Sequence, residues 1–106
     1  MYAREVTVNL KPNNQTMFTQ TLEKEIIPLL RKANGFKDEI TFLTHDRNEA
    51  VGISLWDRKE NADTYSTGTY PQVLKTLDRM VEGTPRIRTY EVSNSTWHKI
   101  AVQKPV

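Results

Sequence analysis

The chain has 106 residues and a mass of 12.3 kDa, which is enough for one domain with one core. Charged residues make up 26% of the sequence and the formal charge is +2, so the composition predicts a folded chain and only weakly supports binding to polyanions. The absence of cysteine excludes disulfides, thiolate nucleophiles and cysteine-based metal sites, and without a long apolar run or a signal-like N-terminus we expect a cytoplasmic protein with no membrane association.

The first predicted elements are a strand and a helix. Residues 4–10 alternate between polar and apolar side chains, which predicts a strand whose buried face carries Val6, Val8 and Leu10. Pro12 cannot donate a backbone hydrogen bond and should end this strand. Residues 15–33 place apolar side chains three and four positions apart, which predicts a helix with one apolar stripe.

Three sequence features mark the ends and the middle of that helix. Asn13 and Asn14 are suited to cap its first turn, and Asn34-Gly35 is suited to end it in a left-handed conformation. Pro28 lies inside the helix and lacks a backbone N–H, so we expect a kink between Lys24 and Pro28.

The second half of the chain repeats the alternation of strands and helices. Residues 36–45 and 50–56 have the character of strands, and the polar run Asp46-Arg47-Asn48-Glu49 between them predicts a tight, antiparallel connection. Two short helices are expected, over about 59–66 and 71–82, with Gly83 capping the second. The last strand is expected over 86–95, followed by a tail over 96–106.

The order strand, helix, strand, strand, helix, strand is typical of the ferredoxin-like α+β fold (βαββαβ). We therefore expect a single domain over residues 1–106, with its core within 4–95. In this fold the four strands form one antiparallel sheet, and both helices cover the same face.

The third strand presents two different rows of side chains. Val51, Ile53 and Leu55 point one way, and Gly52, Ser54 and Trp56 point the other. If the second row faces the helices, the aliphatic row is exposed, although burying each of its side chains is worth roughly 1.5–3 kcal/mol. The sheet of a second subunit would cover it most simply, which predicts a homodimer. The alternative places the aliphatic row beneath the helices and Trp56 at a strand end.

The homodimer orientation also predicts a pocket. Gly52 and Ser54 would be small residues beneath the helices and would leave a space between the sheet and the second helical region. Apolar walls with a few polar groups are typical of small-molecule sites. The residues expected to bind a substrate there are Val6, Val8, Gly52, Ser54 and Leu74. The alternative is that Leu74, Leu77 and Tyr65 fill the space.

Several short motifs resemble the antibiotic biosynthesis monooxygenase-like family of the dimeric α+β barrel group. They are Asn34-Gly35-Phe36, Ile53-Ser54-Leu55-Trp56-Asp57, and Asn61-Ala62-Asp63-Thr64-Tyr65 with Tyr70. The resemblance covers nearly all of residues 4–95. It implies a homodimer whose two sheets pack into a barrel, with a pocket in each subunit between sheet and helices.

The resemblance implies several alternative activities. Members of the family include oxygenases that act on polycyclic phenols or quinols without a cofactor, haem-degrading enzymes, and proteins with no known activity. Trp56 matches a Trp of the haem-degrading branch, but the Asn of its first strand falls on Val6, and residues 71–82 contain no His to ligate iron. The sequence therefore favours a monooxygenase without a cofactor, acting on a small aromatic or quinol; the alternative is a non-catalytic homodimer that binds a small ligand.

The expected catalytic residues are Trp56, Tyr65 and Tyr70. Trp56 could wall the pocket and donate its indole N–H, and the two tyrosines could supply hydroxyl groups to a ligand oxygen. The alternatives are core packing for Trp56 and exposed positions on a helix surface for the tyrosines.

The remaining polar residues give no specific site. His45 and His98 are expected at the surface, and two separated histidines without clustered carboxylates predict no metal site. Arg86 and Arg88 alternate on the last strand, where ion pairs are expected rather than anion binding. The βαββαβ order is shared with RNA-binding domains, which stack bases on aromatic side chains of the central strands. The first and third strands offer no aromatic side chain to the open face, and the sequence has no Lys/Arg-Gly-Phe-type run, so we expect no nucleic-acid partner.

Overall fold

The computed structural model describes residues 1–46 and 48–100. Its elements follow the chain as β1 (Tyr2–Leu10), α1 (Gln15–Thr21), the π-helical turn η1 (Leu22–Ile26), α2 (Ile27–Arg31), β2 (Phe36–Leu43), β3 (Glu49–Trp56), α3 (Lys59–Gly68), α4 (Tyr70–Leu77), the 3₁₀ turn η2 (Asp78–Met80) and β4 (Val81–Glu91). The predicted ferredoxin-like α+β fold is confirmed.

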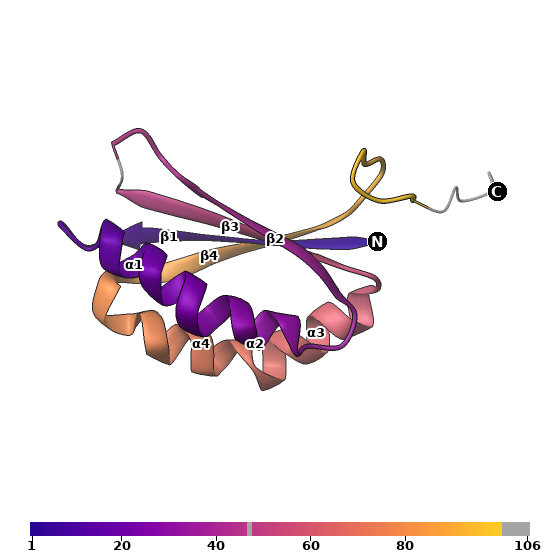
Figure 1. Ribbon diagram of the computed structural model, residues 1–106, viewed down its shortest axis with the longest axis horizontal. Coiled ribbons are helices and arrows are strands. Elements are labelled where there is room, and N and C mark those ends of the chain that lie inside the picture. Colours follow the sequence, from indigo (N-terminus) through magenta and orange to yellow (C-terminus); the bar gives the residue numbers. More distant parts are fainter. Residues whose placement is uncertain (47, 101–106) are drawn as a thin grey trace.

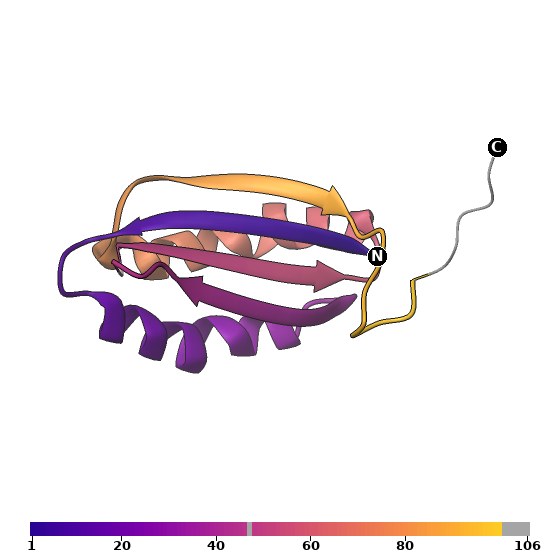
Figure 2. The same cartoon turned by 90° about the horizontal axis from the view of Figure 1, so that it is seen from above.

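The four strands form one antiparallel sheet in the order β2-β3-β1-β4 (Figure 2). Figure 1 shows every helix on the same side of this sheet, whereas residues 92–100, which follow β4, lie on the opposite side. We call the side away from the helices the open face; it carries Val51 and Ile53 from β3, and Ile40 and Phe42 opposite them on β2.

The first helical stretch keeps its direction through Pro28. The turn before the proline widens into η1, in which the backbone N–H of Ile27 donates to the carbonyl of Leu22, and Pro28 then stands in the first turn of α2. A proline is tolerated there because its missing N–H would have had no partner in the helix. The irregularity was predicted between Lys24 and Pro28, and it takes the form of a π turn.

The predicted caps of this stretch have different outcomes. Gly35 has a φ of 78°, so the left-handed ending is confirmed. Asn14 occupies the N-cap position, but its side-chain Nδ2 donates to the carbonyl of Pro12 at 2.9 Å and makes no cap. This bond stabilises the turn over Pro12 and Asn13, in which Asn13 has a φ of 64°.

The boundaries predicted for the last helix and strand were wrong. The helix ends at Leu77 and continues only as η2, because Met80 turns into the core and is fully buried. β4 begins at Val81, which pairs with Leu10, and ends at Glu91. Gly83 is therefore a residue of β4, with a φ of 70°, beside a register shift that also accommodates Pro85. β2 likewise ends at Leu43, two residues before the predicted end.

The orientation predicted for β3 is confirmed. Ala50 and Trp56 are buried in the core beneath the helices, and Gly52 and Ser54 lie on the same side. Val51 and Ile53 point to the open face and are half-buried. The expectation that the whole aliphatic row is exposed is wrong for Leu55, which points to the open face but is buried within the single chain, close to Asp38, its partner on β2.

No helix within the described ranges is long and apolar enough to cross a membrane. Arg47 of the predicted tight connection and residues 101–106 of the predicted tail lie outside the described residues.

Candidate functional site

A cavity of about 280 Å³ lies between the sheet and the helices. Its floor comes from β1, β2 and β3, and its walls come mainly from apolar side chains of the helices, including Phe18, Leu22, Ile26, Leu30, Val73 and Leu77. Asp78, Gly83 and Thr84 are exposed lining residues, so the cavity reaches the surface beside the connection between η2 and β4. The side chains of Leu74, Leu77 and Tyr65 line this space without filling it.

Seven residues that were expected to form the site line this cavity. They are Val6, Val8, Gly52, Ser54, Leu74, Tyr65 and Tyr70. The alternation of β1 and β3 brings the first four to the helix-facing side, and α3 and α4 bring the other three above them. Their contact with a substrate stays a prediction.

Three of the polar lining residues lie on one rung of the sheet. Glu39 of β2 pairs with Ser54 of β3, which in turn pairs with Arg4 of β1, and all three side chains point toward the helices. Neighbouring strands are about 4.8 Å apart, so Glu39 and Arg4 are separated by roughly two strand spacings. Tyr65 and Tyr70 lie over the Arg4 end of this rung.

Arg4 is the most deeply buried charge of the site, with 3% of its surface exposed. Its Nε donates to Oγ of Ser66 at 2.8 Å, and its guanidinium carbon lies 4.0 Å from the ring centre of Tyr70 and 5.6 Å from that of Tyr65. Among the described residues, its Nη2 has no hydrogen-bond partner, and neither has the buried hydroxyl of Tyr70.

Burial keeps both tyrosines protonated. It raises the pKa of Tyr65 to about 12, an effect that the positive charge of Arg4 opposes only in part. Burial also raises the pKa of Tyr70, and this rise is opposed by the positive charge of Arg4 and by the closeness of its guanidinium to the Tyr70 hydroxyl. At neutral pH both side chains therefore present O–H groups, which can donate hydrogen bonds to a ligand.

Glu39 is the half-buried carboxyl group of the cavity. Burial raises its pKa above the ordinary value, and the hydrogen bond that it accepts from the hydroxyl of Thr41 opposes this rise. A carboxylate with a raised pKa is a better proton acceptor than an ordinary one.

Trp56 lies behind the cavity and is not one of its lining residues. It is fully buried, and its indole Nε1 donates to Oγ of Ser54 at 2.9 Å. Its ring also packs against Phe36 and Tyr65, with ring centres 5.6 Å and 5.1 Å away. Trp56 thus holds the positions of Ser54 and Tyr65, and a direct role in the chemistry stays a prediction.

Sequence reasoning missed the polar residues that β1 and β2 contribute to the floor of the cavity, Arg4, Glu39 and Thr41, and also Asp78 and Thr84 near its mouth. The signal for Arg4 was available, because the alternation that buries Val6, Val8 and Leu10 also turns residue 4 inward. Glu39 and Thr41 alternate on β2 in the same way, but a bulge between Phe36 and Asp38 shifts the register. The sequence therefore did not indicate which residues of β2 face the helices.

The motif residues form a junction next to the site. Asp57 donates its backbone N–H to the carbonyl of Gly35 at 2.8 Å and accepts a hydrogen bond from Nδ2 of Asn61, also at 2.8 Å. The pKa of Asp57 is lowered, mainly by this bond from Asn61. The junction joins the ends of α2 and β3 to the start of α3.

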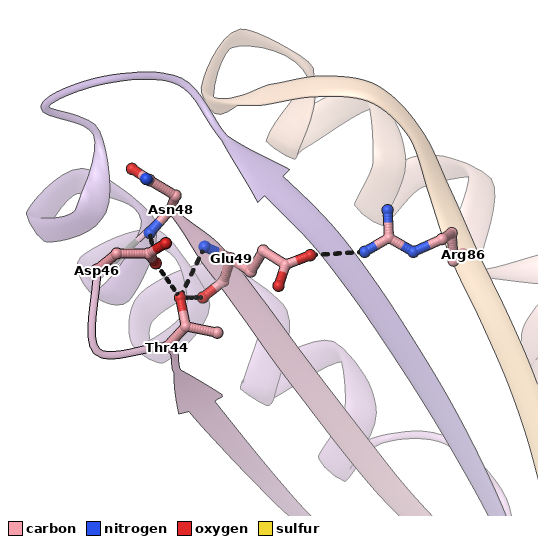
Figure 3. A network of polar contacts seen from close by, with 5 residues as sticks. All are labelled: Thr44, Asp46, Asn48, Glu49 and Arg86. Carbon is pink, nitrogen blue, oxygen red and sulfur yellow. Dashed lines mark hydrogen bonds and ion pairs between the residues drawn. The ribbon is translucent and has the colours of Figure 1, made fainter.

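The other polar residues considered in the sequence lie away from the cavity. His98 contacts Asp38 on the open face, a partner that the sequence did not indicate, and His45 is exposed in the β2–β3 turn. Figure 3 shows Glu49 reaching across β1 to Arg86, with 2.7 Å between carboxylate and guanidinium. No group of three or more His, Asp or Glu residues within the described ranges could hold a metal ion.

Comparisons with known proteins establish the fold. No family model and no curated protein matches the chain. Solved structures do match, among them a monooxygenase from the gene ActVA-Orf6 of Streptomyces coelicolor in complex with nanaomycin D, with 13% identity over 89% of this chain and 88% of that one and a TM-score of 0.75.

Two further matches carry the provisional name antibiotic biosynthesis monooxygenase. One, from Nitrosomonas europaea, has 14% identity over 89% of this chain and 100% of that one, with a TM-score of 0.73. The other, from Deinococcus radiodurans, has 16% identity over 90% and 95% of the two chains, also with a TM-score of 0.73. The chain therefore has the fold of the antibiotic biosynthesis monooxygenase structures, and the resemblance stated from its motifs is confirmed at that level.

Proposed function

We propose that the chain is a monooxygenase-like enzyme that acts on a small aromatic or quinol substrate in this cavity and needs no organic cofactor. The observation that carries the proposal is the cavity itself: apolar walls enclose it, and Glu39, Tyr65 and Tyr70 bring polar groups to one end. A structure of the same fold holds nanaomycin D, which supports a ligand of this general kind.

The proposed reaction draws its electrons from the substrate. Glu39 accepts a proton from an activated CH₂ group next to an aromatic ring, and the resulting carbanion gives one electron to O₂. The substrate radical and superoxide then combine into a peroxide, which takes up a proton and loses water to leave a carbonyl group. The sum is CH₂ + O₂ → C=O + H₂O, which balances without another reductant.

Oxygen uptake tests this proposal. The chain is incubated with a panel of hydroquinones and anthrols, and O₂ consumption is compared with the rate without protein. We expect acceleration with at least one anthrol, a loss of about 10²-fold or more in Glu39→Gln because general-base catalysis is removed, and an unchanged rate in the control Glu49→Gln.

Two outcomes count against the proposal or its parts. No acceleration with any substrate would favour the alternative, a non-catalytic dimer that binds a small ligand. Equal rates in the wild type, Trp56→Phe and Tyr70→Phe would remove Trp56 and Tyr70 from the mechanism.

The proposed assembly is a homodimer through the open face. Val51, Ile53 and Phe42 stand there without cover from the chain's own helices, and Phe42 is exposed. A second copy of the same sheet would bury these side chains and supply apolar stabilisation that a short chain otherwise lacks.

A further inference from the structure

Arg4 is a buried cation without an anionic partner. Its surroundings contain the hydroxyl of Ser66 and the faces of two tyrosine rings, but no carboxylate in the described part of the chain forms an ion pair with it. Buried charges in proteins are usually paired, because removing an ion from water costs several kcal/mol. Ring faces and one hydroxyl offset this cost only in part.

Two polar groups at the same place are also unsatisfied. Nη2 of Arg4 can only donate, and the hydroxyl of Tyr70 has a proton to donate, yet among the described residues neither donates a well-formed hydrogen bond, although the two groups lie close to each other. Both belong to residues that line the cavity. An oxygen atom with a negative charge would accept both hydrogen bonds and neutralise the guanidinium. A water molecule would accept the hydrogen bonds but leave the positive charge without a counter-charge.

The rest of the cavity limits what can carry that oxygen. The walls beyond the Arg4 rung are mainly apolar, and the other ionisable lining residues are Glu39, Tyr65 and Asp78. Asp78 is exposed near the mouth, and Glu39 would repel a second negative charge. The site thus suits an apolar, ring-sized body with a single ionised oxygen.

We infer that the Arg4–Tyr70 end of the cavity binds the ionised oxygen of a monoanionic amphipathic ligand, a phenolate, enolate or carboxylate, with Nη2 of Arg4 and the hydroxyl of Tyr70 as donors. The inference deepens the proposed function by naming the charge state of its substrate. Binding of such an anion does not depend on whether oxygen chemistry follows.

A nitrophenol whose phenolate absorbs visible light is a direct probe of this site. Its titration is followed by absorbance with and without an excess of the wild-type protein. A cation within about 4–6 Å lowers the pKa of an acid by about 1–3 units, so we expect the bound phenolate to be favoured roughly 10- to 1,000-fold over the neutral phenol. A bound probe that keeps its solution pKa would overturn the inference.

Variants assign the effect to the two donors. Arg4→Met should abolish the shift in the pKa of the probe, Arg4→Lys should keep part of it, and Arg88→Met, which removes an exposed guanidinium on the open face, should leave it intact. Tyr70→Phe deletes only a hydroxyl that makes no well-formed hydrogen bond with any described residue, so it should fold normally and lose part of the shift. A full shift in either Arg4→Met or Tyr70→Phe would contradict the assignment.

A second pair of probes separates this inference from the proposed enzyme activity. The anion 1-naphthoate and its neutral counterpart 1-naphthylmethanol have nearly the same shape, and neither is an oxidisable quinol. Calorimetry should show tighter binding of naphthoate, by about 10-fold or more, in the wild type but not in Arg4→Met. Equal affinities in the wild type would refute the anion site even if oxygen uptake were observed, and anion binding without oxygen uptake would refute only the enzyme.

Discussion

Gly35 determines how the chain passes from α2 into β2. Its φ of 78° lies in the left-handed region, and a Cβ atom at this position would collide with Oδ1 of Asp57. That carboxylate cannot move freely, because Asn61 donates to it and the backbone N–H of Asp57 is bonded to the carbonyl of Gly35. The junction therefore requires glycine for both its backbone conformation and its lack of a side chain.

Gly35→Ala should lower the free energy of unfolding by about 2 kcal/mol or more, because the left-handed conformation costs an L residue about 1–2 kcal/mol before the collision with Asp57 is added. Urea denaturation measures the difference. The control is Gly68→Ala, since a Cβ at Gly68 meets nothing within 4 Å at the end of α3. Equal losses in both variants would contradict the strain at Gly35.

Glu39 should make stability fall as the pH rises. Its pKa is raised in the folded state. As the pH rises above the ordinary value of 4.5, the unfolded chain therefore loses the Glu39 proton before the native chain does. The carboxyl group therefore destabilises the fold progressively above that pH. Glu39→Gln should be more stable than the wild type at pH 7, and the difference should vanish toward pH 4 in urea denaturation.

Asp46 provides the matched control of opposite sign. Hydrogen bonds from the hydroxyl of Thr44 and the backbone N–H of Asn48 lower its pKa (Figure 3). Its contribution is present above its unfolded pKa and is lost as the pH falls through its folded pKa. Asp46→Asn should thus be no more stable than the wild type at pH 7. If both variants shift in the same direction, burial is not what governs Glu39.

β3 is the element that separates the cavity from the open face. Its helix-facing row carries the small residues Gly52 and Ser54, and its opposite row carries Val51 and Ile53. A Cβ atom at Gly52 would lie 3.6 Å from Oγ1 of Thr41 and 3.7 Å from Oε1 of Glu39, which are ordinary contact distances. A side chain at position 52 can therefore extend into the cavity without straining the backbone.

Substitutions of increasing size at Gly52 should close the cavity without unfolding the chain. We expect Gly52→Ala to weaken binding of the nitrophenol slightly and Gly52→Leu to weaken it by about 10-fold or more, because the leucine side chain takes the volume of the ligand. Absorbance titration measures affinity, and urea denaturation should show an unfolding free energy equal to or above that of the wild type. Unchanged affinity in Gly52→Leu would place the ligand elsewhere.

At the scale of the whole molecule, the open face predicts self-association. Light scattering at micromolar concentration should give about twice the chain mass of 12.3 kDa. Phe42→Lys should shift the protein toward a monomer, because it places a charge in the apolar part of that face. The control is Ile87→Lys: Ile87 is 46% exposed against 49% for Phe42, but it pairs with Val6 and so lies on the helix side of the sheet. A monomeric wild type would refute the dimer.

The order of elements and the faces of the strands could be read from the sequence because both depend on local periodicity. Alternation of side chains on a strand and their 3.6-residue spacing on a helix assign each residue to a face before any partner is known. The irregular turn before Pro28, the left-handed Gly35 and the inward row of β3 all follow from such local rules. The ends of α4 and β4 did not, because burial of Met80 and pairing of Val81 with Leu10 are contacts between distant segments.

The polar end of the cavity depended on tertiary structure. Glu39, Ser54 and Arg4 come from three strands, and their alignment on one rung results from strand order and from the bulge in β2, neither of which a linear pattern encodes. The position of Trp56 also depends on tertiary structure: it lies outside the cavity lining, and its indole N–H donates to Oγ of Ser54. The sequence alone could thus predict that a cavity lies over Gly52. The contact between the buried Arg4 and the hydroxyl of Tyr70 was decided by the packing of β1 against α3 and α4, because only tertiary packing removes water from a charged side chain.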